Sequence, residues 1–273
     1  MADVTEVMAL LTLRSTGDGV FAPTHYPAVG TDFVFGGQLL AQSVRAATAT
    51  VAHDRLPHSV HANFFMAARP GVSLAYHVEP LRDGGSFSAR RVHAVQQDTR
   101  VFTATVSFNA ARPDPGAVDY QLPAPAAPEP ADDAHPWARV MAGTDLFAAF
   151  DLRELDPAPP GPDGTRPFSR RLWWRTAGFL PDDPGLHAAV AAFASDFGVT
   201  IAASVTAGLY GRASVLTSLD HALWLHRPLR ADAWTLLDLV SVSNAASRGL
   251  VSGTMHAVDG TLVASLAQET LIR

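Results

Sequence analysis

The chain has 273 residues, of which 48% are hydrophobic and 17% are charged, and it contains no cysteine. This composition is typical of a compact protein with one large or two medium domains, and it excludes disulfides, thiolate catalysis and zinc sites built on cysteine. A formal net charge of −6 argues against a nucleic-acid-binding surface, which needs an excess of Lys and Arg.

Residues 1–19 carry acidic side chains where a secretory signal would carry basic ones. No uninterrupted apolar run approaches the roughly 20 residues that a membrane-spanning helix needs. We therefore expect a soluble, cytoplasmic protein that has neither a membrane nor a nucleic acid as its partner.

The first half of the chain predicts one helix followed by four antiparallel strands. In residues 36–51, Leu40, Val44 and Ala47 recur at helical spacing and form an apolar face. Alternating apolar residues, separated by turn residues, then predict strands at residues 58–67, 72–81, 86–97 and 100–108.

Proline dominates the middle of the chain. Residues 111–136 hold many prolines, which lack N–H donors and therefore break helices and central strands. A second stretch of this kind, residues 156–164, follows a short apolar segment. We predict a unit at residues 1–110, a proline-rich linker at 111–165 that crosses the surface, and a second unit at 166–273.

The second half repeats the order of the first. Its helix is predicted at residues 184–197, with Leu186, Val190, Phe193 and Phe197 along one stripe. Its strands are predicted at residues 214–226, 234–243, 247–258 and 261–272.

A shared motif sets the register between the halves. The segment Phe-Gly-Gly-Gln at 35–38 corresponds to Phe-Ala-Ser-Asp at 193–196, which follows it by 158 positions, and the spacing grows to 161 by the last strand. The second half therefore carries a carboxylate that the first half lacks. At this register Asp196, Ser218 and Gln268 correspond to Gln38, Val60 and Ser107 of the first half.

A helix followed by an antiparallel meander, present twice, does not easily form two separate cores. Each unit has one free sheet edge, so pairing the units edge to edge gives a continuous sheet around two central helices. The sequence thus predicts an α+β protein with a double hot-dog fold. Because one chain already supplies both units, we expect any homo-oligomer, a dimer or tetramer by analogy, to use other surfaces.

Six segments, in order, strengthen this interpretation: VFGGQLLAQS, LRDGGSFSARRVHAVQ, ASDF, SLDHALWLHRP, SRGLVSG and DGTLVASLAQE. Together they resemble the type II acyl-CoA thioesterases, double hot-dog enzymes of bacteria and peroxisomes, from about Leu10 to the C-terminus. The resemblance implies hydrolysis of acyl-CoA to free fatty acid and coenzyme A, with no metal, no cofactor and no covalent intermediate.

The resemblance also implies three catalytic residues. The aspartate of the family's ASD motif falls on Asp196, the hydroxyl residue before its DH motif on Ser218, and the glutamine of its terminal QE on Gln268. These residue types suit the chemistry, because a partly desolvated carboxylate is a stronger base and the other two side chains can both donate and accept hydrogen bonds. They would hold and activate a water molecule.

The tetrahedral oxyanion of thioester hydrolysis needs N–H donors. The helix start at Gly36, Gly37 and Gln38 is one candidate, and the N–H groups near Ser195 and Asp196 are another. The Gly-Gly-Gln segment lacks the spacing of a nucleotide-binding loop, so we attribute its glycines to close approach of the helix start to another backbone or to substrate.

Asp220 and His221 are adjacent on a predicted strand and therefore point to opposite faces, so they cannot act together on one atom. Asp220 shares a face with Ser218 and is a candidate supporting residue. His58 and His61 likewise point to opposite faces, and no helical His-x-x-x-His occurs, so we expect no metal site.

Two alternatives remain at this stage. A duplicated fold can keep its groove after losing turnover, which would leave a non-catalytic protein that binds acyl-CoA or an acyl carrier. A hot-dog hydratase acting on enoyl thioesters would carry the motif D-x-N-x-x-H, which this chain lacks. At each single position a structural role is the ordinary one, and for Asp196 that role would be an internal cap or an ion pair.

Overall fold

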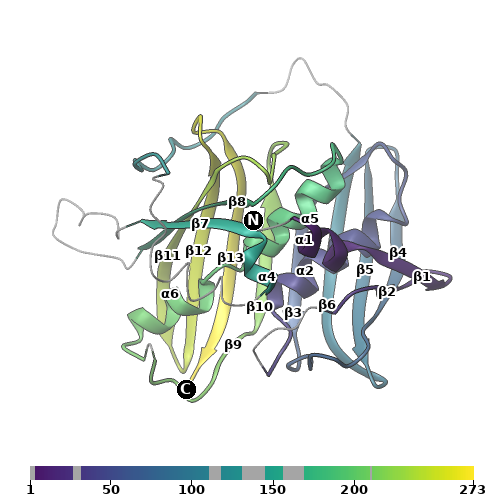
Figure 1. Cartoon of the computed structure of the whole chain (residues 1–273), viewed down its shortest axis with the longest axis horizontal. Coiled ribbons are helices and arrows are strands. Elements are labelled where there is room, and N and C mark those ends of the chain that lie inside the picture. Colours follow the sequence, from purple (N-terminus) through teal and green to yellow (C-terminus); the bar gives the residue numbers. More distant parts are fainter. Residues whose placement is uncertain (1–3, 27–31, 111–117, 131–144, 156–168, 210) are drawn as a thin grey trace.

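The structure is a computed structural model that describes residues 4–26, 32–110, 118–130, 145–155, 169–209 and 211–273 (Figure 1). The described part of the first half contains two helices and six strands. They are α1 (Thr5–Leu11), β1 (Leu13–Gly17), β2 (Val20–Pro23), α2 (Gly36–Thr48), β3 (Arg55–Phe64), β4 (Ala75–Asp83), β5 (Phe87–Gln96) and β6 (Thr99–Ala110).

The second half adds α4 (Asp145–Ala148), β7 (Phe150–Leu155), β8 (Ser169–Thr176), α5 (Pro184–Ala194), α6 (Val199–Thr206), β9 (Leu216–Ser218), β10 (Asp220–Leu225), β11 (Thr235–Ala245), β12 (Arg248–Ala257) and β13 (Leu262–Ile272). The strand predicted at 214–226 is thus interrupted at Leu219. Strand β7 and helix α4 lie within the range that the sequence assigned to the linker. Residues 118–130 of that range contain no helix or strand, and the rest of it lies outside the described residues.

The strands form one antiparallel sheet in the order β1-β2-β4-β5-β6-β3-β10-β13-β12-β11-β8-β7, with β9 beside β13. Strands β3 and β10 join the two halves, and His61 faces Ala222 at the middle of their ladder. In Figure 1 the sheet curves around α2 and α5, with the strands of the first half on one side and those of the second half on the other. The predicted double hot-dog fold is confirmed.

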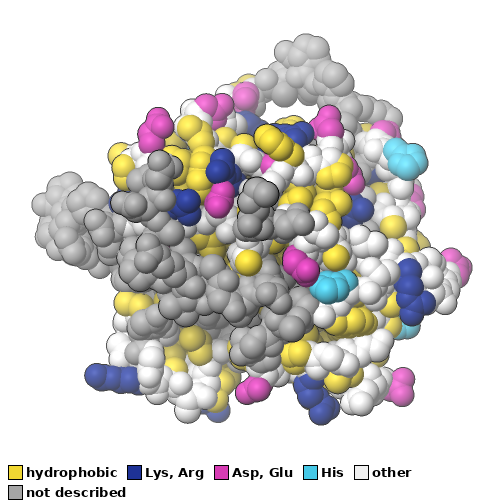
Figure 2. Space-filling view, in the orientation of Figure 1, with side chains coloured by type: hydrophobic (Ala, Val, Ile, Leu, Met, Phe, Trp, Pro, Cys, Tyr) yellow, Lys and Arg dark blue, Asp and Glu magenta, His cyan; other side chains and the backbone are white. Residues whose placement is uncertain are grey.

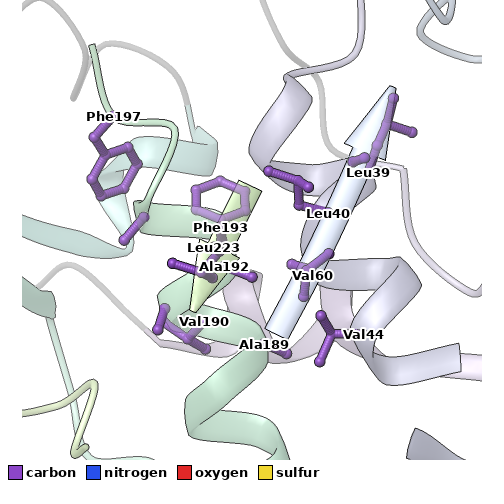
Figure 3. Packing of buried hydrophobic residues seen from close by; sticks show 14 of the residues in the cluster. Leu39, Leu40, Val44, Val60, Ala189, Val190, Ala192, Phe193, Phe197 and Leu223 are labelled. Atoms are coloured by element: carbon purple, nitrogen blue, oxygen red, sulfur yellow. The ribbon is translucent and has the colours of Figure 1, made fainter. Parts of the chain in front are cut away.

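Helices α2 and α5 pack against each other in the core. Figure 3 shows Leu40 of α2, Phe193 of α5, and Val60 and Leu223 of the joining strands pointing into one apolar cluster. At one end of the helix pair Phe35 packs against Phe193, with 5.1 Å between the ring centroids. This aromatic contact holds the start of α2 on the end of α5.

The close packing depends on glycine at the start of α2. A Cβ atom on Gly37 would collide with the backbone oxygen of Phe193, and one on Gly36 would lie 2.7 Å from the Asp196 carboxylate. At Gly37 the collision is with backbone, so only glycine fits there, whereas at Gly36 a Cβ would displace the Asp196 carboxylate. The expected reason for the Gly-Gly pair, close approach to another backbone, is confirmed for Gly37.

The register predicted between the two halves is wrong for the helices. Gly36 is the first residue of α2, whereas Ala194, its predicted counterpart, is the last residue of α5. Similarly, Arg248 begins β12, although Arg90, its predicted counterpart at the 158-residue spacing, lies inside β5. The short helix α6 lies between α5 and the following strands, which shifts the helices and the strands by different amounts.

The second central helix is also shorter than predicted. It ends at Ala194, and a turn through Gly198, whose φ of +73° favours glycine, leads into α6. By length and composition, residues 184–206 could cross a membrane, although Asp196 interrupts their apolar run. In the fold 83% of the 18-residue window that meets this criterion is buried, as expected for a segment of the core.

Candidate active site

Asp196 lies in the turn after α5, at the point where that turn meets the start of α2. Its side-chain oxygen Oδ2 accepts a hydrogen bond of 3.0 Å from the Gly37 N–H. Helix α2 has no capping side chain of its own, because its N-cap residue is Phe35. A carboxylate of the second half therefore caps a helix of the first half, where the N–H groups and the helix dipole favour negative charge.

The environment of Asp196 makes it an unusual carboxyl group. The residue is buried, at 6% exposure, and no basic side chain among the described residues forms an ion pair with it. Burial raises its pKa to about 7, and hydrogen bonds from Gln268 and from the Gly37 N–H limit that rise. A carboxylate with a pKa near neutrality is suited to accept a proton from water at physiological pH.

Gln268 and Ser218 are brought to the same place by neighbouring strands. Gln268 lies on β13 and is fully buried, and its Nε2 donates a hydrogen bond of 2.8 Å to the Ser218 hydroxyl at the end of β9. The same side chain lies close enough to the Asp196 carboxyl group to lower its pKa. The three residues predicted from the sequence thus converge around one amide group.

His221 is a site residue that the sequence interpretation missed. It lies on β10 with 1% exposure, and its Nδ1 is 2.5 Å from Oε1 of Gln268. Its other ring nitrogen, Nε2, is 2.9 Å from the hydroxyl of Ser195. Asp220 and His221 do point to opposite faces, but His221 points inward and contacts the residue that joins Asp196 to Ser218.

The protonation of His221 fixes the orientation of the Gln268 amide. Burial lowers the pKa of His221 to about 4, so the ring is neutral at physiological pH and carries one N–H. Oε1 of Gln268 can only accept, so that N–H is on Nδ1. Nε2 is then an acceptor 2.9 Å from the Ser195 hydroxyl, whose single proton is shared between Nε2 and the Ala192 carbonyl at 2.8 Å. This arrangement leaves both N–H groups of the Gln268 amide free to face Ser218 and Asp196.

The other predicted site residues have different surroundings. The Asp220 carboxylate accepts the Glu269 N–H at 2.8 Å, so it fastens β10 to β13 beside Gln268. The Gln38 N–H bonds to the Phe35 carbonyl, and the Gly37 N–H to Asp196. Among the described residues the Gly36 N–H has no hydrogen-bond partner, which leaves it as the free backbone donor of this helix start.

The N–H groups of Ser195 and Asp196, the second set of oxyanion candidates, are both used within the chain. The Ser195 N–H bonds to the Ala191 carbonyl at 2.8 Å, and the Asp196 N–H bonds to the Phe193 carbonyl at 3.4 Å. The start of α2 is therefore the better source of an oxyanion donor.

Charged side chains lie mostly on the surface and in pairs. On the described part of the face in Figure 2, acidic and basic side chains are interspersed, with no patch of one sign. Two arginines of the strands and loops form ion pairs, Arg90 with Asp83 and Arg227 with Asp119. In the described part of the chain, no cluster of His, Asp and Glu has the makings of a metal site.

Two family models match the chain. The model described as "Acyl-CoA thioesterase N-terminal domain" matches residues 22–109, and the one described as "Acyl-CoA thioesterase C-terminal domain" matches residues 122–272. Together they cover both central helices and the residues of the site.

Known proteins are similar over nearly the full length. Acyl-coenzyme A thioesterase 8 of Mus musculus is 31% identical over 285 residues, which cover 98% of this chain and 88% of the relative. The crystal structure of acyl-CoA thioesterase II TesB2 from Mycobacterium marinum is 31% identical, with a TM-score of 0.80 over 99% of this chain and 98% of that one. A protein from Alicyclobacillus acidocaldarius described as having a hot dog fold shares the architecture, with 19% identity, a TM-score of 0.76 and 97% of both chains covered.

Proposed function

Since this chain belongs to the acyl-CoA thioesterase family, we propose that it hydrolyses acyl-CoA to a fatty acid and coenzyme A, with Asp196 as general base and Ser218 and Gln268 holding the attacking water. The supporting observation is the convergence of all three side chains around the Gln268 amide, with a carboxyl group of raised pKa among them. A structural cap alone would not require a serine and a glutamine at the same point.

The first step is activation of water. The water donates one proton toward the Asp196 carboxylate while the Gln268 amide and the Ser218 hydroxyl fix its position. Its oxygen attacks the thioester carbon, and Asp196 takes the proton as the C–O bond forms. The Gly37 N–H keeps its hydrogen bond to the Asp196 carboxyl group, which is now neutral. Burying this neutral group costs less free energy than burying an unpaired charge.

The second step is collapse of the tetrahedral intermediate. Its oxyanion is stabilised by a backbone donor at the start of α2, where the Gly36 N–H is unused among the described residues. The C–S bond breaks, and the departing thiolate takes the proton from Asp196. The products are the carboxylic acid and the thiol of coenzyme A, and Asp196 returns to its ionised form.

The non-catalytic alternative, binding of acyl-CoA without turnover, gives no reason for the pKa of Asp196 to be raised. The geometry favours catalysis over it, because a binding groove gains nothing from a buried carboxylate whose pKa lies near 7. The hydratase alternative needs an acid and a histidine directed at one water, and here His221 faces the amide of Gln268 instead.

The test is a thiol-release assay with acyl-CoAs of graded chain length, comparing wild type with Asp196→Asn. The variant should lose about 100- to 10,000-fold in kcat, because the amide cannot accept the proton of the water. Asp183→Asn, which changes a carboxylate at the start of α5, is the matched control and should retain activity. Equal rates for wild type and Asp196→Asn would refute the assignment of the base.

The pH dependence of kcat/KM provides an independent check. The base works only when ionised, so kcat/KM should fall as the pH drops through about 7, the pKa of Asp196 in the free enzyme. A rate that stays constant down to pH 5 would show that another group accepts the proton.

A further inference from the structure

A cavity lies at the end of the α2–α5 helix pair opposite to Asp196. It has a volume of about 540 Å³ and lies beside Pro184, the first residue of α5. Its walls are largely apolar and include Leu56, Ala188, Leu225 and Leu229. The size and the apolar lining are those of a small-molecule site.

The two-fold relation between the halves identifies this cavity as the counterpart of the site at Asp196. Because His61 and Ala222 face each other at the middle of the β3–β10 ladder, a local two-fold axis passes between them. The axis exchanges the start of α5 with the start of α2. It also exchanges Leu225, the last residue of β10, with Phe64, the last residue of β3. Phe64 lies next to Gly36 at the catalytic end, as Leu225 lies near Pro184 here.

The residues that activate water are missing from this end. The axis places Val60 of β3 at the position that corresponds to His221 of β10. Val60 pairs with Val106 on the neighbouring strand β6, whereas His221 contacts Gln268 on its neighbouring strand β13. The predicted correspondence of Val60 with Ser218 is therefore wrong. The carboxylate at the start of α5 is of a different kind: Asp183 lies beside Gly185, but it is partly exposed and pairs with Arg45, whereas Asp196 is buried.

One buried polar group points to a ligand. His187 lines the cavity with 2% exposure, and its Nδ1 accepts the Ala231 N–H at 3.1 Å. The proton of the neutral ring is therefore on Nε2, and Nε2 has no hydrogen-bond partner among the described residues. Nε2 is covered by neighbouring atoms, so an acceptor reaches it from the cavity once the ring turns toward the lining, and the hydrogen bond then formed gains free energy.

The charges around the cavity favour a neutral acceptor. Arg230 is paired with Asp182 and Asp232, and Arg227 with Asp119, so their charges are balanced. Burial lowers the pKa values of His58 and His226, which keeps both rings uncharged at neutral pH. Moving a neutral thioester carbonyl from water into this cavity costs less free energy than moving a charged carboxylate or phosphate there.

We propose that this cavity is a second acyl thioester site, which binds the acyl chain of an acyl-CoA along its apolar walls and the thioester carbonyl at Nε2–H of His187 without hydrolysing it. The assignment of acyl-CoA rests on the proposed function of the catalytic end. One chain would then bind two acyl-CoA molecules and hydrolyse one of them.

The test counts ligands on the intact chain. The probe is a ketone thioether of coenzyme A, in which a methylene separates the sulfur from the carbonyl so that the bond cannot be hydrolysed. Equilibrium dialysis should find two bound molecules per wild-type chain and one per Ala188→Phe chain, whose new ring fills the cavity. Ala188→Ser, which leaves the volume open, is the matched control and should bind two.

Thioesterase activity of Ala188→Phe should stay within about twofold of wild type, because Ala188 lies away from Asp196. His187→Asn is the second variant: its amide oxygen can still accept the Ala231 N–H, but the distal donor is lost. It should weaken the ketone probe about fivefold at the second site and leave an S-alkyl thioether, which has no carbonyl, unaffected.

One bound probe per wild-type chain, with normal hydrolysis, would overturn the second site and leave the proposed function intact. Two bound probes with no hydrolysis of any acyl-CoA would leave the second site standing and refute the proposed function. Tighter binding of a free fatty acid than of the ketone probe at the Ala188-dependent site would overturn the thioester assignment.

Discussion

The two ends of the helix pair place the same residue types in contrasting surroundings. At each end an aspartate accepts the N–H of a glycine at the second position of a helix, Asp183 from Gly185 and Asp196 from Gly37. The Asp183 side chain is 46% exposed and pairs with Arg45 at 3.1 Å. Asp196 is buried and, among the described residues, has no cationic partner. The comparison teaches that capping geometry is shared, whereas burial and the missing cation raise the pKa of one of the two carboxyl groups toward neutrality.

The largest expected effect comes from adding one methyl group at each end. Gly37→Ala should destabilise the protein by about 4 kcal/mol or more, because its Cβ would meet the backbone of Phe193, which cannot move freely. In Gly185→Ala the Cβ would lie 3.2 Å from the side chains of Asp183 and Thr48, which can shift, so the change should stay within about 1 kcal/mol. Denaturant unfolding measures both, and equal losses would show that the two ends are packed alike.

The next effect concerns stability as a function of pH. The pKa of Asp196 is about 7 in the folded protein and about 3.8 in the unfolded chain, so the folded state loses stability as the pH rises from 4 to above 7. Asp196→Asn removes this loss and should become more stable than wild type at pH 8, by up to roughly 4 kcal/mol. At pH 4 the two should be nearly equal.

Asp183→Asn is the matched control for this series. It loses the ion pair with Arg45 and should gain no stability at pH 8, since an exposed pair of this kind contributes about 1 kcal/mol or less. Thermal unfolding across the pH range compares the three proteins. A stability gain for Asp183→Asn equal to that for Asp196→Asn would contradict the contrast between the ends.

The smallest expected effect tests the role of His221 as a positioning residue. His221→Leu should lower kcat by about 100-fold with little change in KM, because the Gln268 amide loses the donor that orients it. His221→Asn, whose amide N–H can take the place of Nδ1–H, should recover much of that loss. Steady-state kinetics decide, and two variants with equal kcat would assign His221 a packing role instead.

The sequence predicted the strands well because their signal is local. The strand expected at 86–97 is β5 at Phe87–Gln96, since alternating burial along a sheet leaves a period of two in the sequence. The last two strands on each side of the sheet, β1 and β2 on one and β7 and β8 on the other, were not predicted. Within β8 the residues Ser169–Trp174 are all buried, so no alternation marks that stretch.

The end of α5 shows what local patterns cannot reveal. Phe197 continues the apolar stripe of Phe193 past Ala194, so the pattern gives no sign that the helix ends at Ala194. The break places Asp196 in a turn facing α2, and from this break follows the error in the register between the halves. His221 was missed for a related reason: its contact with Gln268 joins two strands that are neighbours only in the folded sheet.

The two halves belong to one polypeptide chain and share one sheet, and this has a further consequence. In a dimer of identical chains, the symmetry axis repeats every side chain, so a substitution that suits one end is imposed on the other as well. Here the local two-fold axis relates Val60 to His221, but each of the two residues has its own codon and can change independently. A tandem chain can therefore abandon chemistry at one end and refine it at the other, a freedom that symmetric subunits lack.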